Sequence, residues 1–448
     1  MPAIRHVRRR PGALPDKGRE YSGYRGGHQF GPAYNRPMAG ADDGSGQMMF
    51  DVAVVGRGSV GAAAALALAQ AGLRTTCIGP LAPPATATPP ADDWDPRIFA
   101  LSPSSRRLLQ SLRIWDAMDG ARIAPVYDMR VYPGPAAAGA VELHFDAYEA
   151  RVDALAWILE GRNLAATFER ALGFSAVTLF DASVTGIDAD RSAQVTLSLD
   201  NGRRIGAKLL VGADGAQSVT RRLCGIDPQV HEYPQTAVVA NFAGARPHRD
   251  TACQWFGAHG VLAMLPLPGE RLSMVWSAPH ALAAELQGLP PQELVQRVVG
   301  VAGLGFAGLW VISPAQAFPL KRIDCPSLIG ERLVLVGDAA HVVHPLAGQG
   351  MNLGFGDVSA LGGVMAGRER HRDPGDPLLL RRYERARSEP VAAMRLTTDA
   401  LQKLFDTQQL GRLGALAAPV AFVRDSGWRL VASSGWLRRR LIEAAAAG

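Results

Sequence analysis

The chain has 448 residues, of which 48% are hydrophobic and 20% are charged, values typical of a globular protein large enough for two closely joined domains. No apolar run approaches the ~18 residues of a membrane span. The net charge of +6 is concentrated at the ends, since residues 1–47 hold eight Lys/Arg against four Asp/Glu and residues 421–448 hold five Arg against two acids. The part between them is nearly neutral, which argues against nucleic acid as a partner.

The four cysteines form no CxxC pair, so the sequence indicates neither a metal site nor a disulfide framework, and we expect reduced thiols in a cytoplasmic enzyme. Residues 1–47 are rich in Gly, Pro and Arg and lack apolar periodicity, which predicts a disordered extension. They contain no apolar segment of a secretory signal. Pro11 and Pro15 oppose the amphipathic helix of a transit peptide, and our hypothesis is that translation begins at Met48 or Met49.

Folded structure is predicted to begin with a buried strand at residues 50–55, a Gly-rich turn, a helix at 62–71 and a second strand at 74–78. The turn is a G-x-G-x-x-G motif between strand and helix, which is the context of dinucleotide binding. Its glycines permit a tight turn, the approach of a pyrophosphate and close helix–strand packing. The predicted cofactor-binding residues here are Gly56, Gly58, Ser59, Val60 and Gly61.

The acidic residue that usually follows the second strand and binds the adenosine ribose is missing, because this strand ends Cys77-Ile-Gly79-Pro. Asp92, Asp93 and Asp95 are candidates for that role only through their proximity in sequence. Arg97 precedes a helix predicted at residues 104–112 and is a candidate for phosphate contact. The alternative for Arg97 is a solvated surface arginine.

Two further buried strands end in a carboxylate. The strand at residues 208–212 leads into Asp214-Gly215 and a short helix near Ser218, and the strand at residues 333–336 leads into Gly337-Asp338. Ligands of open α/β sheets bind at the carboxyl ends of the strands. We therefore predict that both corners and the G-x-G-x-x-G turn converge on one crevice.

A turn of small residues at 345–350 follows the second corner and leads into a helix that starts near Gln349 or Gly350. The free N–H groups at the start of that helix would face the crevice, where they attract an electron-rich ligand. His341 and His344 flank this turn, and we interpret both as structural rather than catalytic.

The remaining pattern predicts short strands at residues 122–145, an amphipathic helix at 157–172 and a hairpin around Asp200-Asn-Gly202. From residue 227 to 326 strand-like runs dominate, with a helix at 291–301, which indicates an antiparallel sheet. Trp255, Met264, Met274 and Trp276 in this sheet are expected to be core residues more often than ligand-lining ones.

The predicted fold class is α/β (α+β overall): a Rossmann-like cofactor-binding domain, an antiparallel substrate sheet and a C-terminal helical region. The predicted domains are a disordered extension (1–47), the first part of the cofactor-binding domain (48–226, with strands 122–145 joining the substrate sheet), the substrate sheet (227–326), the second part of the cofactor-binding domain (327–366) and C-terminal helices (367–448, clearest at 381–446).

Four segments together resemble the flavoprotein aromatic hydroxylases of the p-hydroxybenzoate hydroxylase class, and within it the ubiquinone-biosynthesis hydroxylase family (UbiH/UbiF/VisC). The run His344-Pro-Leu-Ala-Gly-Gln-Gly-Met-Asn352-Leu-Gly354, with Asp357, is similar to that family's own signature. The resemblance covers residues 49–448. The other segments that carry it are the G-x-G-x-x-G start, Gly212-Ala-Asp214-Gly215 with Ser218 and Arg221, and the sheet segment 262–277.

The resemblance implies a mechanism in which NAD(P)H reduces FAD, O2 adds at flavin C4a, and the distal oxygen of that hydroperoxide is transferred to an electron-rich phenol ring. Asp338 would bind the ribitol of FAD, and the backbone N–H groups of Gly350, Met351 and Asn352 would stabilise reduced flavin. Pro345 would lie at the oxygen-reaction face. The implied cofactor-binding set also contains Arg97, Asp214, Gly215, Gly337, Ala347, Gly348 and Gln349.

No second G-x-G-x-x-G is found, so NAD(P)H is expected to bind transiently. The favoured substrate is a polyprenylated phenol of ubiquinone biosynthesis. The alternatives are a small soluble aromatic acid, or a non-catalytic flavoprotein that scaffolds a complex of quinone-biosynthesis enzymes. Residues 427–441 combine two tryptophans with an arginine cluster, which is compatible with peripheral contact with the inner membrane and equally with an ordinary helix packed on the flavin domain.

Overall fold

The computed structural model describes residues 47–81, 93–134, 142–189, 194–244, 247–344 and 350–405, together with Ser434. The predictions for residues 1–46, for Asp92 and for the turn at 345–349 lie outside the described residues. Within them, the first sheet has the strand order β18-β19-β11-β1-β2-β8, and the hairpin partner β10 pairs with the first half of β11. Its strands are β1 (Met48–Val55), β2 (Thr75–Ile78), β8 (Thr178–Phe180), β9 (Val184–Ala189), β10 (Val195–Leu199), β11 (Arg204–Gly212), β18 (Ile329–Gly330) and β19 (Leu333–Leu335).

The parallel part of this sheet aligns the predicted ligand-binding corners. Val55 at the end of β1 pairs with Gly212 at the end of β11, and Gly212 pairs with Leu335 at the end of β19. The three strands therefore end at one edge, as the sequence predicted. Their side chains are almost all buried, which explains why these segments are continuously apolar rather than alternating.

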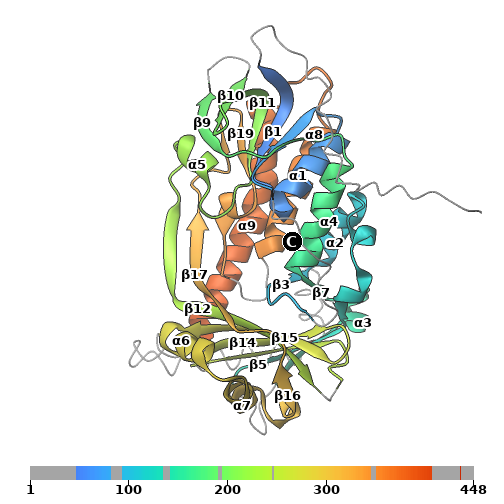
Figure 1. Cartoon of the computed structure of the whole chain (residues 1–448), viewed down its shortest axis with the longest axis vertical. Coiled ribbons are helices and arrows are strands. Elements are labelled where there is room, and N and C mark those ends of the chain that lie inside the picture. Colours follow the sequence, from blue (N-terminus) through green and yellow to red (C-terminus); the bar gives the residue numbers. More distant parts are fainter. Residues whose placement is uncertain are drawn as a thin grey trace, which may run out of the picture. The chain divides into compact units, whose positions relative to one another are not determined.

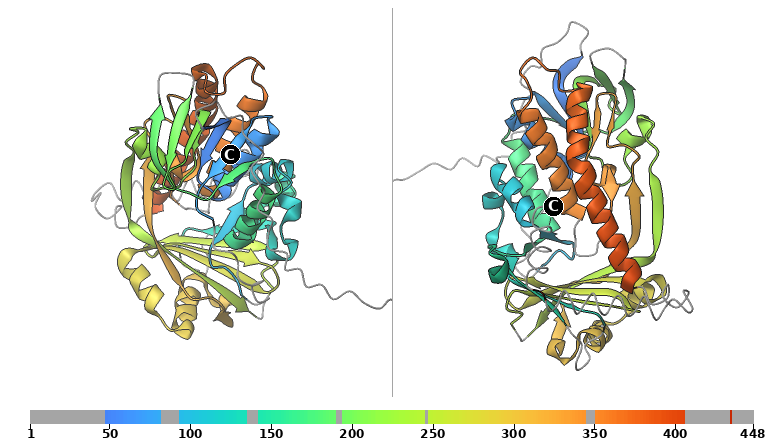
Figure 2. Two further views of the ribbon diagram at one scale, coloured as in Figure 1. Left: turned by 45° about the horizontal axis from the view of Figure 1, so that its top comes forward. Right: turned by 180° about the vertical axis from the view of Figure 1, so that it is seen from behind.

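Four helices pack against one another beside this sheet: α1 (Ser59–Gln70), α4 (Gly161–Gly173), α8 (Gly350–Ala366) and α9 (Pro377–Phe405). Figure 1 shows α1 next to α4 and α8, and the rear view in Figure 2 shows the long helix α9 alongside α8. The buried face of α1 consists mainly of alanines, whose small side chains permit close helix packing. Helix α8 begins where the sequence predicted.

The second sheet has the order β20-β17-β12-β15-β14-β13-β5-β6, with β16 also paired to β12. All its neighbours are antiparallel except β13 and β5, which run parallel. Helices α6 (His280–Gly288) and α7 (Pro291–Ala302) accompany it, and Figure 1 shows both on the face turned away from α1 and α8. The strands are β5 (Asp128–Tyr132), β6 (Leu143–Asp146), β12 (Gln229–Gly244), β13 (Thr251–Gly257), β14 (Gly260–Leu267), β15 (Arg271–Pro279), β16 (Leu309–Val311), β17 (Gln316–Asp324) and β20 (His341–Val342).

The core of this second sheet confirms the expected role of its large side chains. Trp255, Met264, Met274 and Trp276 are almost fully buried in one cluster, together with residues of α6 and α7. They pack the helix-covered face and do not line the face on the opposite side of the sheet. Helix α6 was not predicted from the sequence, although Pro279 marks the end of β15 and directly precedes the helix.

A small third sheet of β3 (Ile98–Leu101), β7 (Ala156–Glu160) and β4 (Ile123–Val126) corrects one prediction. The predicted helix at 157–172 is wrong at its start, because residues 157–160 belong to β7 and pair with both β3 and β4. A short apolar run fits a buried strand as well as the first turn of a helix. Of the strands predicted at 122–145, β5 and β6 join the substrate sheet and β4 does not. The short helices in this region are α2 (Pro103–Ser111), α3 (Ala147–Ala150) and α5 (Val219–Leu223).

The predicted C-terminal helices begin with α9, which extends from Pro377 to Phe405. Apart from Ser434, the rest of the C-terminal segment, including the Trp- and Arg-rich stretch, lies outside the described residues. Among the described residues, no helix is long and apolar enough to cross a membrane.

Candidate active site

The G-x-G-x-x-G turn is packed against the second corner through two of its glycines. A β-carbon on Gly56 would lie 2.2 Å from the carbonyl oxygen of Ala213, and one on Gly61 would lie 2.0 Å from the carbonyl oxygen of Gly56. Gly56 also has φ +113°, a conformation that L side chains rarely adopt. The fold itself therefore requires glycine at both positions, and the packing brings the turn against the Asp214 loop.

Gly58 is different, because the chain gives no reason for its lack of a side chain. Its φ of −67° suits any residue, and nothing lies within 4 Å of the place where a β-carbon would stand. It forms the N-cap of α1, whose first N–H groups receive no side-chain cap and no acidic residue. An open space before uncapped N–H groups suits a phosphate, so these residues fit the pyrophosphate of a dinucleotide.

The Gly337-Asp338 corner lies next to the start of α1. Gly337 has φ +59°, and a β-carbon on it would lie 3.0 Å from Cγ1 of Val60. A β-carbon on Gly354 would lie 2.8 Å from Cγ2 of Val60 and 3.2 Å from Cα of Gly337. The two glycines and Val60 thus allow β19, α1 and α8 to meet, which places Asp338 near the phosphate-binding N-terminus.

The Asp338 side chain is exposed, yet protein surrounds it closely enough to change its acidity. Burial is the largest influence and raises the pKa of this carboxyl above its usual range, while the charges of His341 and Lys321 act in the opposite direction. An accessible carboxylate within a largely enclosed setting is a suitable acceptor for ligand hydroxyls.

A buried carboxylate, that of Asp357 on α8, binds the backbone of the Gly337-Asp338 corner. It is fully buried and accepts a hydrogen bond of 2.8 Å from the N–H of Gly337 and one of 2.7 Å from Nε of Arg387 on α9. Nε2 of His341 lies 2.8 Å from Oδ2, the oxygen that also accepts from the N–H of Gly337. Burial alone would raise the pKa of Asp357, but His341, Arg387 and the Gly337 N–H outweigh it and lower the pKa. The carboxylate is therefore ionised and fixes Gly337.

Both histidines of this region make contacts within the protein. His341 is paired with Asp357, and Nε2 of His344 donates a hydrogen bond of 2.9 Å to Oε1 of Gln235, while the His344 ring meets the ring of Tyr233 edge-on. Their exposed fractions are 5% and 1%. This geometry agrees with the structural role that the sequence favoured.

Asn352 connects the first turn of α8 to the third sheet. Its Oδ1 accepts hydrogen bonds from the N–H of Ser102 and the hydroxyl of Ser105, and its Nδ2 donates to the carbonyl of Ala100. The side chain of Asn352 is thus used within the protein, and the flavin contact predicted for this residue concerns its backbone N–H. Gly350 and Met351 precede it in the same turn, whereas Pro345, Ala347, Gly348 and Gln349 lie outside the described residues.

The Asp214 carboxylate caps the short helix α5. It accepts hydrogen bonds from the hydroxyl of Ser218 and the N–H of Thr220, so its role in the structure is to shape the loop next to Gly56. Arg221 is buried and donates to the carbonyls of Ala339 and Ala216. This arginine therefore links the two corners, and its place in the family motif was the only signal for it in the sequence.

Two of the acids proposed as ribose ligands, Asp93 and Asp95, are already engaged elsewhere. Asp95 accepts hydrogen bonds from the backbone N–H groups of Arg97 and Arg162, and Asp93 is paired at 2.8 Å with Nη1 of Arg162. The Arg97 side chain is 67% exposed and 3.9 Å from Asp95, so it is accessible for the predicted phosphate contact.

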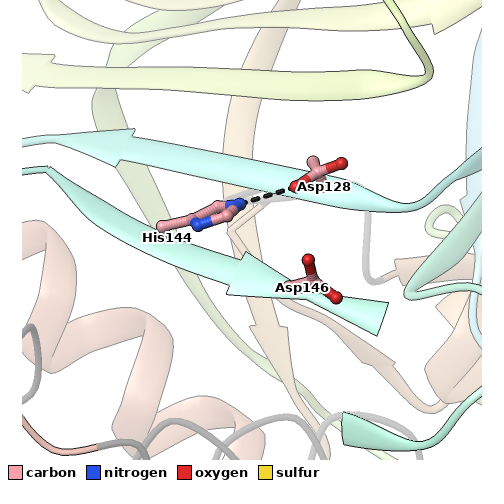
Figure 3. A group of neighbouring side chains, drawn as sticks. All are labelled: Asp128, His144 and Asp146. Atoms are coloured by element: carbon pink, nitrogen blue, oxygen red, sulfur yellow. Dashed lines mark hydrogen bonds and ion pairs between the residues drawn. The ribbon is translucent and has the colours of Figure 1, made fainter. Parts of the chain in front are cut away.

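Figure 3 shows a separate cluster on β5 and β6, in which Asp128, His144 and Asp146 each offer a ligand atom within 4.8 Å of the others. Each of the three side chains has a hydrogen bond within the protein. His144 is hydrogen-bonded to Asp128 at 2.6 Å, and Asp146 accepts from the N–H groups of Tyr148 and Glu149 as the N-cap of α3. These contacts account for the cluster without a metal ion.

Comparison with known proteins agrees with this geometry. A family model described as an FAD-binding domain matches residues 49–398. The ubiquinone hydroxylase UbiL of Rhodospirillum rubrum is 34% identical over 411 residues, which is 91% of each chain. The 3-demethoxyubiquinol 3-hydroxylase of Escherichia coli is 32% identical over 88% of this chain and 97% of that protein. The chain belongs to this family of FAD-dependent hydroxylases.

Solved structures share the fold at lower identity. PqsL of Pseudomonas aeruginosa, in complex with 2-aminobenzoylacetate, superposes with a TM-score of 0.68 at 23% identity and covers 81% of this chain and 98% of its own. HpxO of Klebsiella pneumoniae, complexed with FAD and uric acid, gives a TM-score of 0.65 at 19% identity over 90% of this chain and 98% of that one. The protein is an FAD-dependent aromatic-ring monooxygenase with FAD as its cofactor.

The substitution Gly58→Val should weaken FAD binding and leave the apoprotein stable, because the added side chain enters only the space in front of α1. We expect the Kd for FAD, measured by flavin fluorescence on titration of the apoprotein, to rise at least about tenfold. Gly61→Val is the contrasting variant and should lower the unfolding temperature, because its β-carbon meets backbone. Unchanged FAD affinity in the Gly58 variant would contradict this reading of the turn.

Asp357→Asn should destabilise the protein by about 3–5 kcal/mol, because Arg387 would lose its charge partner in a buried site. Because folding lowers the pKa of Asp357, its contribution is fully present above the unfolded pKa near 3.8 and is lost as the pH falls through the lower folded value. Urea unfolding between pH 7 and pH 3 should therefore show a steeper acid loss in the wild type than in the variant. If the wild type and the variant lost the same stability as the pH falls, the role of the ionised Asp357 in stability would be ruled out.

Proposed function

We propose that this protein hydroxylates the aromatic ring of a polyprenylated phenol intermediate of ubiquinone biosynthesis, with O2 as oxidant and NAD(P)H as transient reductant. The observation that carries the proposal is the 34% identity to a ubiquinone hydroxylase over nine-tenths of both chains. Similarity that extends over both the cofactor-binding elements and the substrate sheet supports a shared reaction class.

The face of the second sheet that lies opposite α6 and α7 is apolar, which supports an apolar substrate. In β14 and β15, Leu262, Met264, Met274 and Trp276 pack against α6 and α7, so the alternate residues of these strands lie on the opposite face. The residues in those positions include Ala263, Leu265 and Val275, and Ala263 and Leu265 pack with Trp94, Val126 and Ile158. An apolar face of this kind is suited to a hydrophobic ring and keeps water out.

The residues at the edge of the first sheet would position the cofactor. FAD, when bound, supplies the oxygen-activating chemistry. We propose that Asp338 accepts hydrogen bonds from the ribitol hydroxyls and that the N–H groups of Gly350, Met351 and Asn352 donate to the electron-rich edge of the ring system. Arg97 would contact the pyrophosphate, and Pro345 would lie on the side where oxygen reacts. The remaining loop residues, Ala347, Gly348, Gln349, Asp214 and Gly215, would border the cleft.

Two alternatives differ in substrate or in chemistry. A small soluble aromatic acid would require a cation to pair with its carboxylate on the face of the sheet opposite α6 and α7. Ala263, Leu265 and Val275 are apolar, and Arg271, which alternates with the buried Leu272 in β15, lies 5.0 Å from the ring of Trp94 and donates a hydrogen bond to the carbonyl of Pro268. A non-catalytic flavoprotein that scaffolds a complex of quinone-biosynthesis enzymes would bind FAD without turnover.

A prenylated phenol should stimulate NAD(P)H oxidation by the purified flavoprotein and yield a hydroxylated ring. Oxygen uptake, NAD(P)H absorbance and product mass are the measurements, and 4-hydroxybenzoate serves as the soluble control. The quinone intermediate that accumulates in a deletion strain would identify the ring position. A yellow protein that oxidises NAD(P)H equally with and without every phenol tested would favour the scaffold.

We further propose peripheral membrane contact through residues 427–441, in which Trp428 and Trp436 accompany the cluster Arg438–Arg439–Arg440. Aromatic rings and cationic side chains together favour an anionic lipid surface. Flotation with vesicles that contain anionic phospholipid should recover the full chain, and recovery should fall several-fold when residues 421–448 are removed. Equal recovery of both proteins would exclude this segment as the contact.

A further inference from the structure

The missing ribose acid has a structural reason in this chain. Gly79 occupies the position after β2 where the acid usually stands, and a β-carbon on it would lie 3.0 Å from Cβ and 3.1 Å from the backbone nitrogen of Arg57. Arg57 is the second residue of the G-x-G-x-x-G turn. Its side chain therefore begins in the space that an acid at position 79 would use.

Arg57 leads to a carboxylate on a different element. Its Nη2 donates a hydrogen bond of 2.8 Å to Oε2 of Glu169 on α4, and α4 packs against α1. The side chains are 5% and 27% exposed, so the arginine is buried and the glutamate remains accessible. Both charges act on the thiol of Cys77, whose pKa burial raises to about 12. The pair therefore lies beside the end of β2.

The pair has unused hydrogen-bonding capacity. Among the described residues, Nε of Arg57 is buried and has no hydrogen-bond partner, and the hydrogen bond from Arg57 involves only Oε2 of Glu169. The other carboxylate oxygen of Glu169 belongs to a side chain that is 27% exposed. It can accept a hydrogen bond from a ribose hydroxyl, which is the role of the missing acid.

We infer that Glu169, held by Arg57, replaces the missing acid and binds the adenosine ribose hydroxyls of FAD. Glu169 is then a cofactor-binding residue, and Arg57 is the residue that positions it. The site comes from α4 rather than from the strand end, which explains why the usual spacing rule fails for this chain.

The test compares FAD with an analogue that lacks both hydroxyls of the adenosine ribose. Apoprotein of the wild type and of Glu169→Gln is titrated with each flavin, and Kd is measured by fluorescence. The wild type should bind FAD about tenfold more tightly than the dideoxy analogue, the effect of one hydrogen bond to a charged group. Glu169→Gln should bind both flavins with the affinity that the wild type shows for the dideoxy analogue, so that only the binding of FAD is weakened.

The matched control is Glu285→Gln on α6, which removes a glutamate that is also paired with an arginine, Arg297, but belongs to the substrate sheet. It should bind FAD as the wild type does. The inference is overturned if the wild type does not distinguish the two flavins, a comparison that requires no variant. It is also overturned if Glu169→Gln weakens both flavins equally, which would indicate a structural role, or weakens neither.

Discussion

The candidate site depends on one buried interaction, the contact of the Asp357 carboxylate with three groups from three elements. The Gly337 N–H, His341 and Arg387 come from the corner after β19, from β20 and from α9. A charge without these partners would be too costly to bury. The Asp357 carboxylate therefore fixes the Gly337-Asp338 corner relative to α8 and α9. It thereby also fixes the position of the exposed Asp338 carboxylate.

Glycines in this fold serve two purposes that the structure separates. At Gly56, Gly61 and Gly354 the neighbouring atoms leave no room for a β-carbon, so the protein's own packing demands glycine. At Gly58 the space is open, and its position before the uncapped N–H groups of α1 suits an external ligand. Sequence patterns alone cannot distinguish Gly58 from Gly56 and Gly61, because all three belong to the same G-x-G-x-x-G turn.

Strand periodicity and the Gly-rich motifs were sufficient to predict the parallel strands, their common edge and the start of α8. They failed where one stretch of sequence is compatible with both a helix and a strand. An example is Trp157, which lies in a strand because β3 and β4 pair with it from both sides. Contacts between distant residues were also out of reach. Nothing near Arg387 or Glu169 in the sequence indicates that the first would pair with Asp357 and the second with Arg57. These partners are brought together only by the packing of α9 on α8 and of α4 on α1.

Strand β12 also limits how this protein can change in length. It has 16 residues and pairs with β17 along both of its halves, with one register shift between Glu232 and Thr236, and β17 in turn pairs with β20 beside the flavin corner. At about 3.3 Å per residue, β12 extends roughly 50 Å and sets the separation between corner and substrate sheet. Inserting one residue into β12 would turn the side chains that now lie opposite α6 and α7 toward these helices, because successive side chains alternate between the two faces. Inserting two residues would keep each side chain on its own face but would displace the sheet by about 7 Å. We therefore expect relatives to differ in length in their loops and not in β12. We expect substrate size to be adjusted by different side chains on the face of the sheet opposite α6 and α7.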